Sequence, residues 1–140
     1  MRQASLFDHC APLASAMPAI KAAMRAVAGA PEGEGRKALP DKINAVANAC
    51  GVKLTSGNER IVSEATLHKW LSPSEERPPS ILAVLAFCHA TGSHEPLRAM
   101  LHPLGLDVMT EDDRKLCEYA RAILKQKETR KRIKLLEESL

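Results

Sequence analysis

The run from Ser80 to Gly92, S-I-L-A-V-L-A-F-C-H-A-T-G, constrains the fold more than any other stretch of this sequence. Ile81 to Cys88 is almost wholly apolar, while serine and glycine at the two ends of the run are typical helix caps. A helix that is apolar on every side is stable in water only when other elements cover it. The sequence therefore predicts a helix at the centre of the fold.

Two more helices are predicted in the first 51 residues. Met17 to Ala30 has apolar residues at helical spacing, and Pro18 is tolerated in a first turn. Residues 31–40 contain two glycines and two prolines, which predict a loop. Pro40 then opens a second helix, which is expected to end at Gly51.

Residues 53–61 follow the second helix without a helical period. Ser56-Gly57-Asn58 indicates a turn, so this segment is predicted as either a small hairpin or a surface loop. A short helix is expected next, capped by Ser63, with Leu67 and Trp70 on its inner side.

A shorter helix is predicted around Glu95 to Leu101, and a long one runs from the acidic stretch after Thr110 towards the C-terminus. The long helix carries two apolar patches on either side of a cationic run, residues 125–132. We assign the first patch to the domain core or to a subunit interface. The second patch needs a partner, because a short end segment is marginally helical alone. The residues predicted to mediate self-association are Leu116, Tyr119, Ile123, Ile133, Leu136 and Leu140.

These elements predict an all-α fold, a compact helical bundle with an additional C-terminal helix. The chain of 140 residues has the size of one domain with a tail. We expect an N-terminal arm at 1–16, a helical domain at 17–109 and an oligomerisation helix at 110–140.

The charge distribution gives only a weak indication of a polyanionic partner. The formal net charge is +3. Residues 41–80 carry equal numbers of basic and acidic side chains, whereas residues 121–134 carry seven lysines and arginines against one glutamate. That basic segment is predicted either to meet phosphates or to be a solvated helix face.

The four cysteines lie far apart without a C-x-x-C spacing, so neither a zinc ribbon nor a disulfide framework is expected. The N-terminus lacks the apolar run of a signal peptide, and no stretch has the apolar length of a membrane span. We expect a cytoplasmic protein that does not enter the membrane.

The sequence contains no motif that indicates catalysis: a Gly-rich phosphate loop, H-E-x-x-H and G-x-S-x-G are all missing. Cys88, His89, His94 and His102 are residue types that bind metals, but they lack an ordinary zinc spacing. We expect no enzyme activity, no small-molecule substrate, no metal and no cofactor.

The segments A-V-A-N-A-C-G-V and V-S-E-A-T-L-H-K-W-L together contain what a helix-turn-helix needs. Such a motif has an alanine where its helices touch, a glycine at the turn, and apolar residues on the inner side of its second helix. The residues that fit these roles are Ala47, Gly51, Val62, Leu67 and Trp70. The outward first turn of the second helix would then enter the major groove.

Over residues 41–127 the chain resembles the helix-turn-helix regulators of temperate phages and prophages, in the broad lambda-repressor-like group. It is most similar to the lambda CII activator type, which has A-x-x-x-G-V, a recognition helix ending in tryptophan, and S-x-L-L-A-V-L. The resemblance implies a DNA-binding transcription regulator that binds double-stranded DNA as a homo-oligomer, a dimer or tetramer. The insertion of residues 53–61 between the two helices departs from the usual motif.

By position, the resemblance places three side chains at base edges: Glu64, Ala65 and Thr66. It places two at phosphates: Ser63 and Lys69. If the insertion is a wing, two more cations contact DNA: Lys53 and Arg60.

Two alternatives to this interpretation remain. Ser63, Glu64 and Thr66 are also what an ordinary N-cap and first turn contain, and His68 is expected to face solvent. The balanced charge of residues 41–80 favours a helical adaptor, an interaction protein that has kept the fold without DNA binding.

Overall fold

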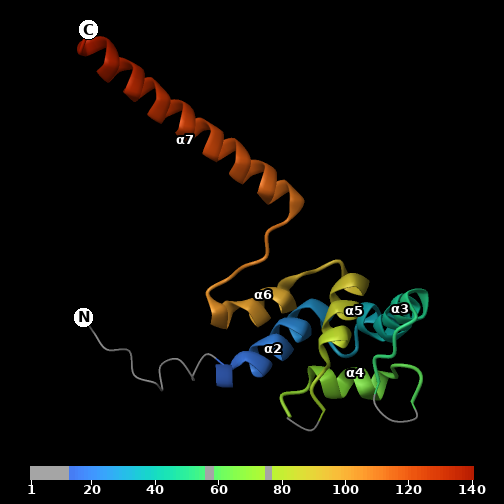
Figure 1. The fold of residues 1–140 in the computed structure, drawn as a ribbon. Coiled ribbons are helices and arrows are strands. Elements are labelled where there is room, and N and C mark those ends of the chain that lie inside the picture. Colours follow the sequence, from blue (N-terminus) through green and yellow to red (C-terminus); the bar gives the residue numbers. More distant parts are fainter. Residues whose placement is uncertain (1–12, 56–58, 75–76) are drawn as a thin grey trace. The chain divides into compact units, whose positions relative to one another are not determined.

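The computed structural model describes residues 13–55, 59–74 and 77–140. These residues form helices and connecting segments, without a β-strand, so the predicted all-α fold class is confirmed. The elements shown in Figure 1 are α2 (Ala16–Ala28), α3 (Glu34–Cys50), α4 (Glu64–Leu71), α5 (Ile81–Thr91), α6 (Glu95–Leu101), the short 3₁₀ helix η1 (His102–Leu104) and α7 (Glu111–Glu138). The predicted N-terminal arm lies outside the described residues as far as residue 12.

The chain divides into two compact units, Met1–Val108 and Met109–Leu140. In the first unit, α5 contacts α2, α3 and α6, while α4 contacts α2 and α3. Ser80 caps α5 as predicted, because its Oγ accepts a hydrogen bond from the Ala83 amide at 3.1 Å. Helix α2 contacts α3, α4, α5 and α6, and α5 packs against three of the other helices.

The prediction that α5 is covered on every side is wrong for its outer face. Phe87 and Val84 are buried, but Ile81, Leu82 and Leu85 are exposed, with 69% of the surface of Ile81 accessible. Neighbouring helices cover only one side of α5, so a uniformly apolar sequence leaves leucine and isoleucine on the other side.

Helix α3 begins at Glu34, so the predicted loop at 31–40 is wrong from residue 34 onwards. Leu39, Ile43 and Ala47 are buried at successive steps of four residues. Their burial extends the helix towards its N-terminus and offsets the unfavourable helix propensities of Gly35 and Pro40.

The described part of the insertion, residues 53–55 and 59–61, has no strand, and residues 56–58 lie outside the described part of the chain. Leu54 is buried in the core, and the Thr55 hydroxyl donates a hydrogen bond to the Glu59 carbonyl. The start of this segment is thus anchored in the first unit.

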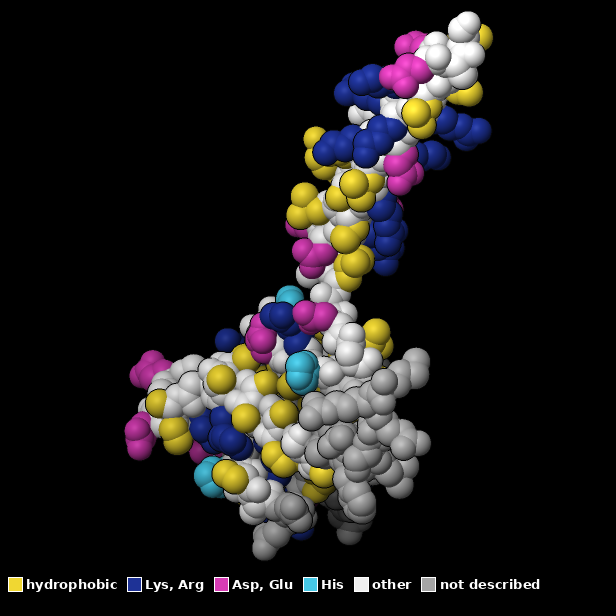
Figure 2. All heavy atoms as spheres, turned by 90° about the vertical axis from the view of Figure 1, so that its left-hand side faces the viewer, with side chains coloured by type: hydrophobic (Ala, Val, Ile, Leu, Met, Phe, Trp, Pro, Cys, Tyr) yellow, Lys and Arg dark blue, Asp and Glu magenta, His cyan; other side chains and the backbone are white. Residues whose placement is uncertain are grey.

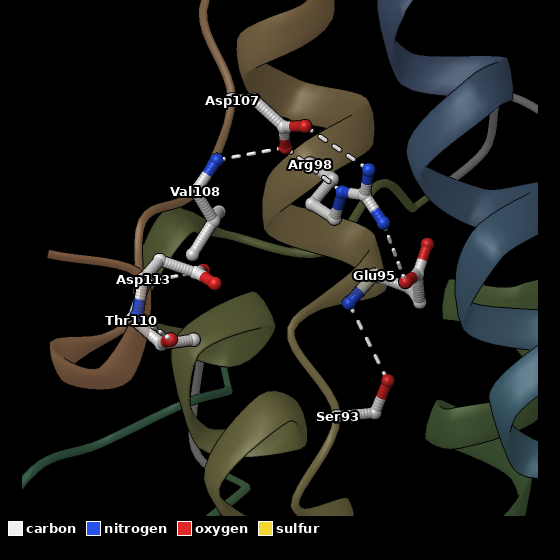
Figure 3. A network of polar contacts seen from close by, with 7 residues as sticks. All are labelled: Ser93, Glu95, Arg98, Asp107, Val108, Thr110 and Asp113. Carbon is white, nitrogen blue, oxygen red and sulfur yellow. Dashed lines mark hydrogen bonds and ion pairs between the residues drawn. The ribbon is translucent and has the colours of Figure 1, made fainter. Parts of the chain in front are cut away.

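Arg98 holds the segment that follows η1 against α6 (Figure 3). Its Nε and Nη2 donate to the two carboxylate oxygens of Asp107 at 2.8 and 3.0 Å, and its Nη1 donates to Glu95 at 3.1 Å. The Arg98 guanidinium and the Val108 amide, which also donates to the carboxylate, lower the pKa of Asp107.

The second unit is dominated by α7. Its N-terminus carries a reciprocal capping box, in which Thr110 accepts from the Asp113 amide at 3.2 Å and Asp113 accepts from the Thr110 amide at 3.0 Å. None of its 28 residues, all of which the structure describes, is buried.

No helix within the described residues is both long and apolar enough to cross a membrane.

Candidate nucleic-acid interface

The connection between α3 and α4 is longer than a helix-turn-helix turn and returns alongside α3. Gly51 ends α3 with φ +65°, in the left-handed region that favours glycine. After the insertion, the Asn44 side chain forms hydrogen bonds with both backbone groups of Val62. Its Nδ2 donates to the Val62 carbonyl at 2.9 Å, and its Oδ1 accepts from the Val62 amide at 2.7 Å. The chain thus enters α4 beside the middle of α3.

The N-terminus of α4 is capped as the sequence predicts. Ser63 Oγ accepts a hydrogen bond from the Thr66 amide at 3.1 Å and lies 3.1 Å from the Thr66 hydroxyl. Glu64 in the first turn is favourable beside the positive end of the helix dipole.

Two cations of α2 hold the C-terminal end of α4. Lys21, only 2% exposed, donates from Nζ to the carbonyls of Ser72 at 3.0 Å, Ser74 at 2.6 Å and Lys69 at 3.4 Å. Arg25 Nη1 donates to the Leu71 carbonyl at 2.7 Å. Cations stabilise the carbonyl end of a helix, so α4 is fixed at both ends.

Sequence reasoning missed the contacts that Asn44, Lys21 and Arg25 make with the α4 region. A spacing of four residues places Lys21 and Arg25 on one side of α2, next to the buried Ile20 and Met24. That position among apolar residues was the available signal that Lys21 is buried.

The structure corrects the predicted outer face of α4. Thr66, expected at base edges, is buried with 8% exposure, because it lies one turn before Trp70 and on the same side of the helix. Glu64 and Ala65 are exposed as the prediction requires, and His68 is exposed as well. The outward set is therefore Glu64, Ala65 and His68.

The residues predicted at phosphates are not all equally accessible. Ser63, Lys53 and Arg60 are exposed, whereas Lys69 is half-buried. Trp70 is buried in the core, as predicted.

Grooves flank α4 on two sides. The first, of about 290 Å³, is lined by Pro31, Arg36, Lys37, Glu64, Ala65, Leu67 and His68. The second, of about 630 Å³, is lined by Lys53, Leu54, Thr55, Glu59, Thr66, Trp70, Arg77, Pro78, Ser80, Ile81 and Leu82. Among the described residues that line them, each groove has two Lys or Arg side chains and one carboxylate.

The described residues contain no group of three or more His, Cys, Asp or Glu side chains placed to hold a metal ion. Cys88 is buried, and this burial raises the pKa of its thiol, against the opposing effect of a backbone hydrogen bond at Leu97. A thiol with a raised pKa is a poor metal ligand, because thiolates are the species that bind metals.

The apolar side chains of α7 have no cover within their own unit. Leu116, Tyr119, Ile133, Leu136 and Leu140 are exposed, and Ile123 is half-buried. Figure 2 shows hydrophobic side chains along α7 with Lys and Arg side chains beside them.

Comparison with protein-family models, with curated proteins and with solved structures gives no match. We therefore infer the function from the residues of this chain.

Proposed function

We propose that this chain is a DNA-binding transcription regulator of the helix-turn-helix kind, similar to those of phages and prophages, with α4 as its recognition helix. The observation that carries the proposal is the way α4 is held. Leu67, Trp70 and Leu71 are buried, and both ends of the helix are fixed by side-chain hydrogen bonds. A short helix held in this way presents its outer side chains as a rigid set, as base recognition requires.

The outward residues of α4 suit limited base reading in the major groove. Glu64 can accept a hydrogen bond from cytosine N4, and the Ala65 methyl can contact the methyl group of thymine. His68 adds a ring nitrogen that donates to an acceptor such as guanine N7 or O6. Three such contacts give modest sequence specificity for one subunit.

Self-association through α7 would supply the remaining specificity. The exposed residues Leu116 and Tyr119 lie near one end of the helix, Ile133 and Leu136 lie towards the other end, and Leu140 follows the end of the helix. Pairing with a second copy would bury these side chains and produce the two-fold symmetry of a palindromic operator. Two recognition helices would then enter successive major grooves about one helical turn apart.

A helical adaptor is the second candidate function, favoured by the exposed apolar face of α5. Ile81, Leu82 and Leu85 lie together on its outer side. Exposed apolar side chains that are grouped in this way are typical of protein–protein contacts.

Binding of a random-sequence DNA duplex at low salt separates the two candidates. A DNA-binding regulator should bind with an affinity that falls steeply as salt rises, because phosphate contacts release counterions. Selection of bound fragments from a random DNA pool should then enrich a two-fold symmetric site. A chain that binds no duplex at low salt is not a DNA-binding regulator, and the adaptor is then the better candidate.

A further inference from the structure

The grooves that flank α4 carry cations from elements outside the predicted motif. Arg36 and Lys37 come from the first turns of α3, which the sequence predicted as a loop, and Arg77 comes from the connection between α4 and α5. Lys37 and Arg77 are exposed, whereas Arg36 is half-buried and lies 3.5 Å from the Gly29 carbonyl.

Together with Lys53, these cations form one pair in each of the two grooves beside α4. Glu64 and His68 line the groove that contains Arg36 and Lys37. On the other side of the helix, Thr66 and Trp70 line the groove that contains Lys53 and Arg77.

The dimensions of duplex DNA allow a helix in the major groove to have phosphates on both flanks. An α-helix with its side chains is about 10–12 Å across, and the major groove of B-DNA is about 12 Å wide. A helix that fills the groove therefore has one sugar-phosphate strand along each flank. Contacts to these strands position the helix without reading sequence.

We propose that the two grooves beside α4 receive the two sugar-phosphate strands of one major groove, with Arg36 and Lys37 contacting one strand and Lys53 and Arg77 contacting the other. This inference rests on the proposed DNA-binding function. It assigns a phosphate-binding role to Arg36, Lys37 and Arg77 and places Lys53 on a defined strand.

Each groove also contains a carboxylate, which lowers the positive charge available to a phosphate strand. Glu64 is the carboxylate of the first groove, and it lies on the outward face of α4, where it would meet base edges. Glu59 accompanies Lys53 and Arg77 in the second groove, so the described residues that line each groove carry one excess positive charge.

Three single substitutions test the proposal in the full chain. Lys37→Ala removes a cation from the first groove, and Arg77→Ala removes one from the second. Lys42→Ala is the matched control, because Lys42 is an exposed lysine of α3 that is not among the residues lining either groove. The measurement is the dissociation constant of a random-sequence duplex over a range of salt concentrations.

Lys37→Ala and Arg77→Ala should each weaken binding to all sequences similarly and lower the salt slope by about one. Lys42→Ala should leave the slope unchanged. An equal decrease in all three variants would overturn the proposal, because it would indicate only the effect of total charge. A decrease in only one of the two groove variants would overturn the two-strand placement. If the unmodified chain binds no duplex, the proposed function itself is wrong.

Discussion

The helices α2–α6 and the helix α7 place their apolar side chains in opposite surroundings. In the first unit, Met24, Ile43, Leu71 and Phe87 are completely inaccessible to solvent. In α7 no residue is buried, although Leu116, Tyr119 and Ile123 have the spacing of residues on one face of a helix. The first unit is thus stabilised by its own interior, whereas α7 has local stabilisation from its capping box and lacks an apolar partner within its unit.

Replacing a core aromatic residue should separate the two regions most strongly. Trp70→Ala should reduce the free energy of unfolding by about 3–5 kcal/mol, because it removes a large buried side chain. Tyr119→Ala, which truncates an exposed aromatic side chain on α7, should change the unfolding of α2–α6 by less than about 0.5 kcal/mol. Denaturant unfolding of both variants measures the difference, and equal losses would contradict the contrast.

Helix α4 likewise has one buried side and one exposed side, so substitutions on its two sides should differ in their effect on stability. Thr66→Arg should destabilise the protein by about 1–3 kcal/mol, because a larger, charged side chain does not fit at a buried position. His68→Arg, two residues further on and exposed, should stay within about 0.5 kcal/mol of the unmodified protein. Thermal unfolding of the pair tests which side of α4 faces outwards, and a stable Thr66→Arg variant would show that the buried side has been misassigned.

Truncation after Lys125 should affect association while leaving the first unit intact. Removing residues 126–140 deletes Ile133, Leu136 and Leu140, so the number of subunits per assembly, measured by sedimentation, should fall. The free energy of unfolding of α2–α6 should change by less than about 0.5 kcal/mol.

The full-length double variant Ile133→Asp/Leu136→Asp is the control for the truncation, because it removes apolar side chains and keeps the cations. This variant should show the same decrease in the number of subunits per assembly. If the truncated chain keeps the oligomeric state of the full chain, the α7 end segment is a solvated tail.

The smallest effect is expected at the exposed network of Arg98. Arg98 lowers the pKa of Asp107 in the folded protein, so the ionised carboxylate stabilises the folded state at pH values above 3.8, the ordinary pKa of the group. This contribution is lost as the pH falls through the lower pKa that Asp107 has in the folded protein. Asp107→Asn should therefore have a slightly lower unfolding midpoint than the unmodified protein near neutral pH, and this difference in midpoint should disappear in acid. Unfolding midpoints between about pH 7 and about pH 2 measure this gap, and a constant gap would contradict the assigned role of the ion pair.

Local signals explain why much of the fold could be predicted. Ser63, Ser80 and Thr110 each cap the helix that their sequence context indicates, and each makes its hydrogen bond within three residues. The apolar run of α5 likewise identifies a helix that supplies buried residues to the core, although it does not indicate which side is left uncovered.

The errors at the candidate site have two physical causes. With only eight residues, α4 gives few apolar positions to define its phase, so Thr66 was assigned to the wrong side. The bonds from Lys21 to the α4 region join residues that are 48 to 53 positions apart, and a local pattern does not contain such contacts.

The sequence does not predict the early start of α3, because glycine and proline usually interrupt helices, whereas here the burial of Leu39 prevails.

The buried ammonium group of Lys21 has a consequence for the amide-exchange behaviour of α4. Opening the end of α4 would take three carbonyl oxygens away from a charge that lies in the interior, and the loss of hydrogen-bond acceptors by a buried charge is costly. The last turn of α4 is therefore tied to α2 and opens together with it. Although α4 has only eight residues and lies at the surface, its backbone amides should exchange with deuterium as slowly as those of the core helices.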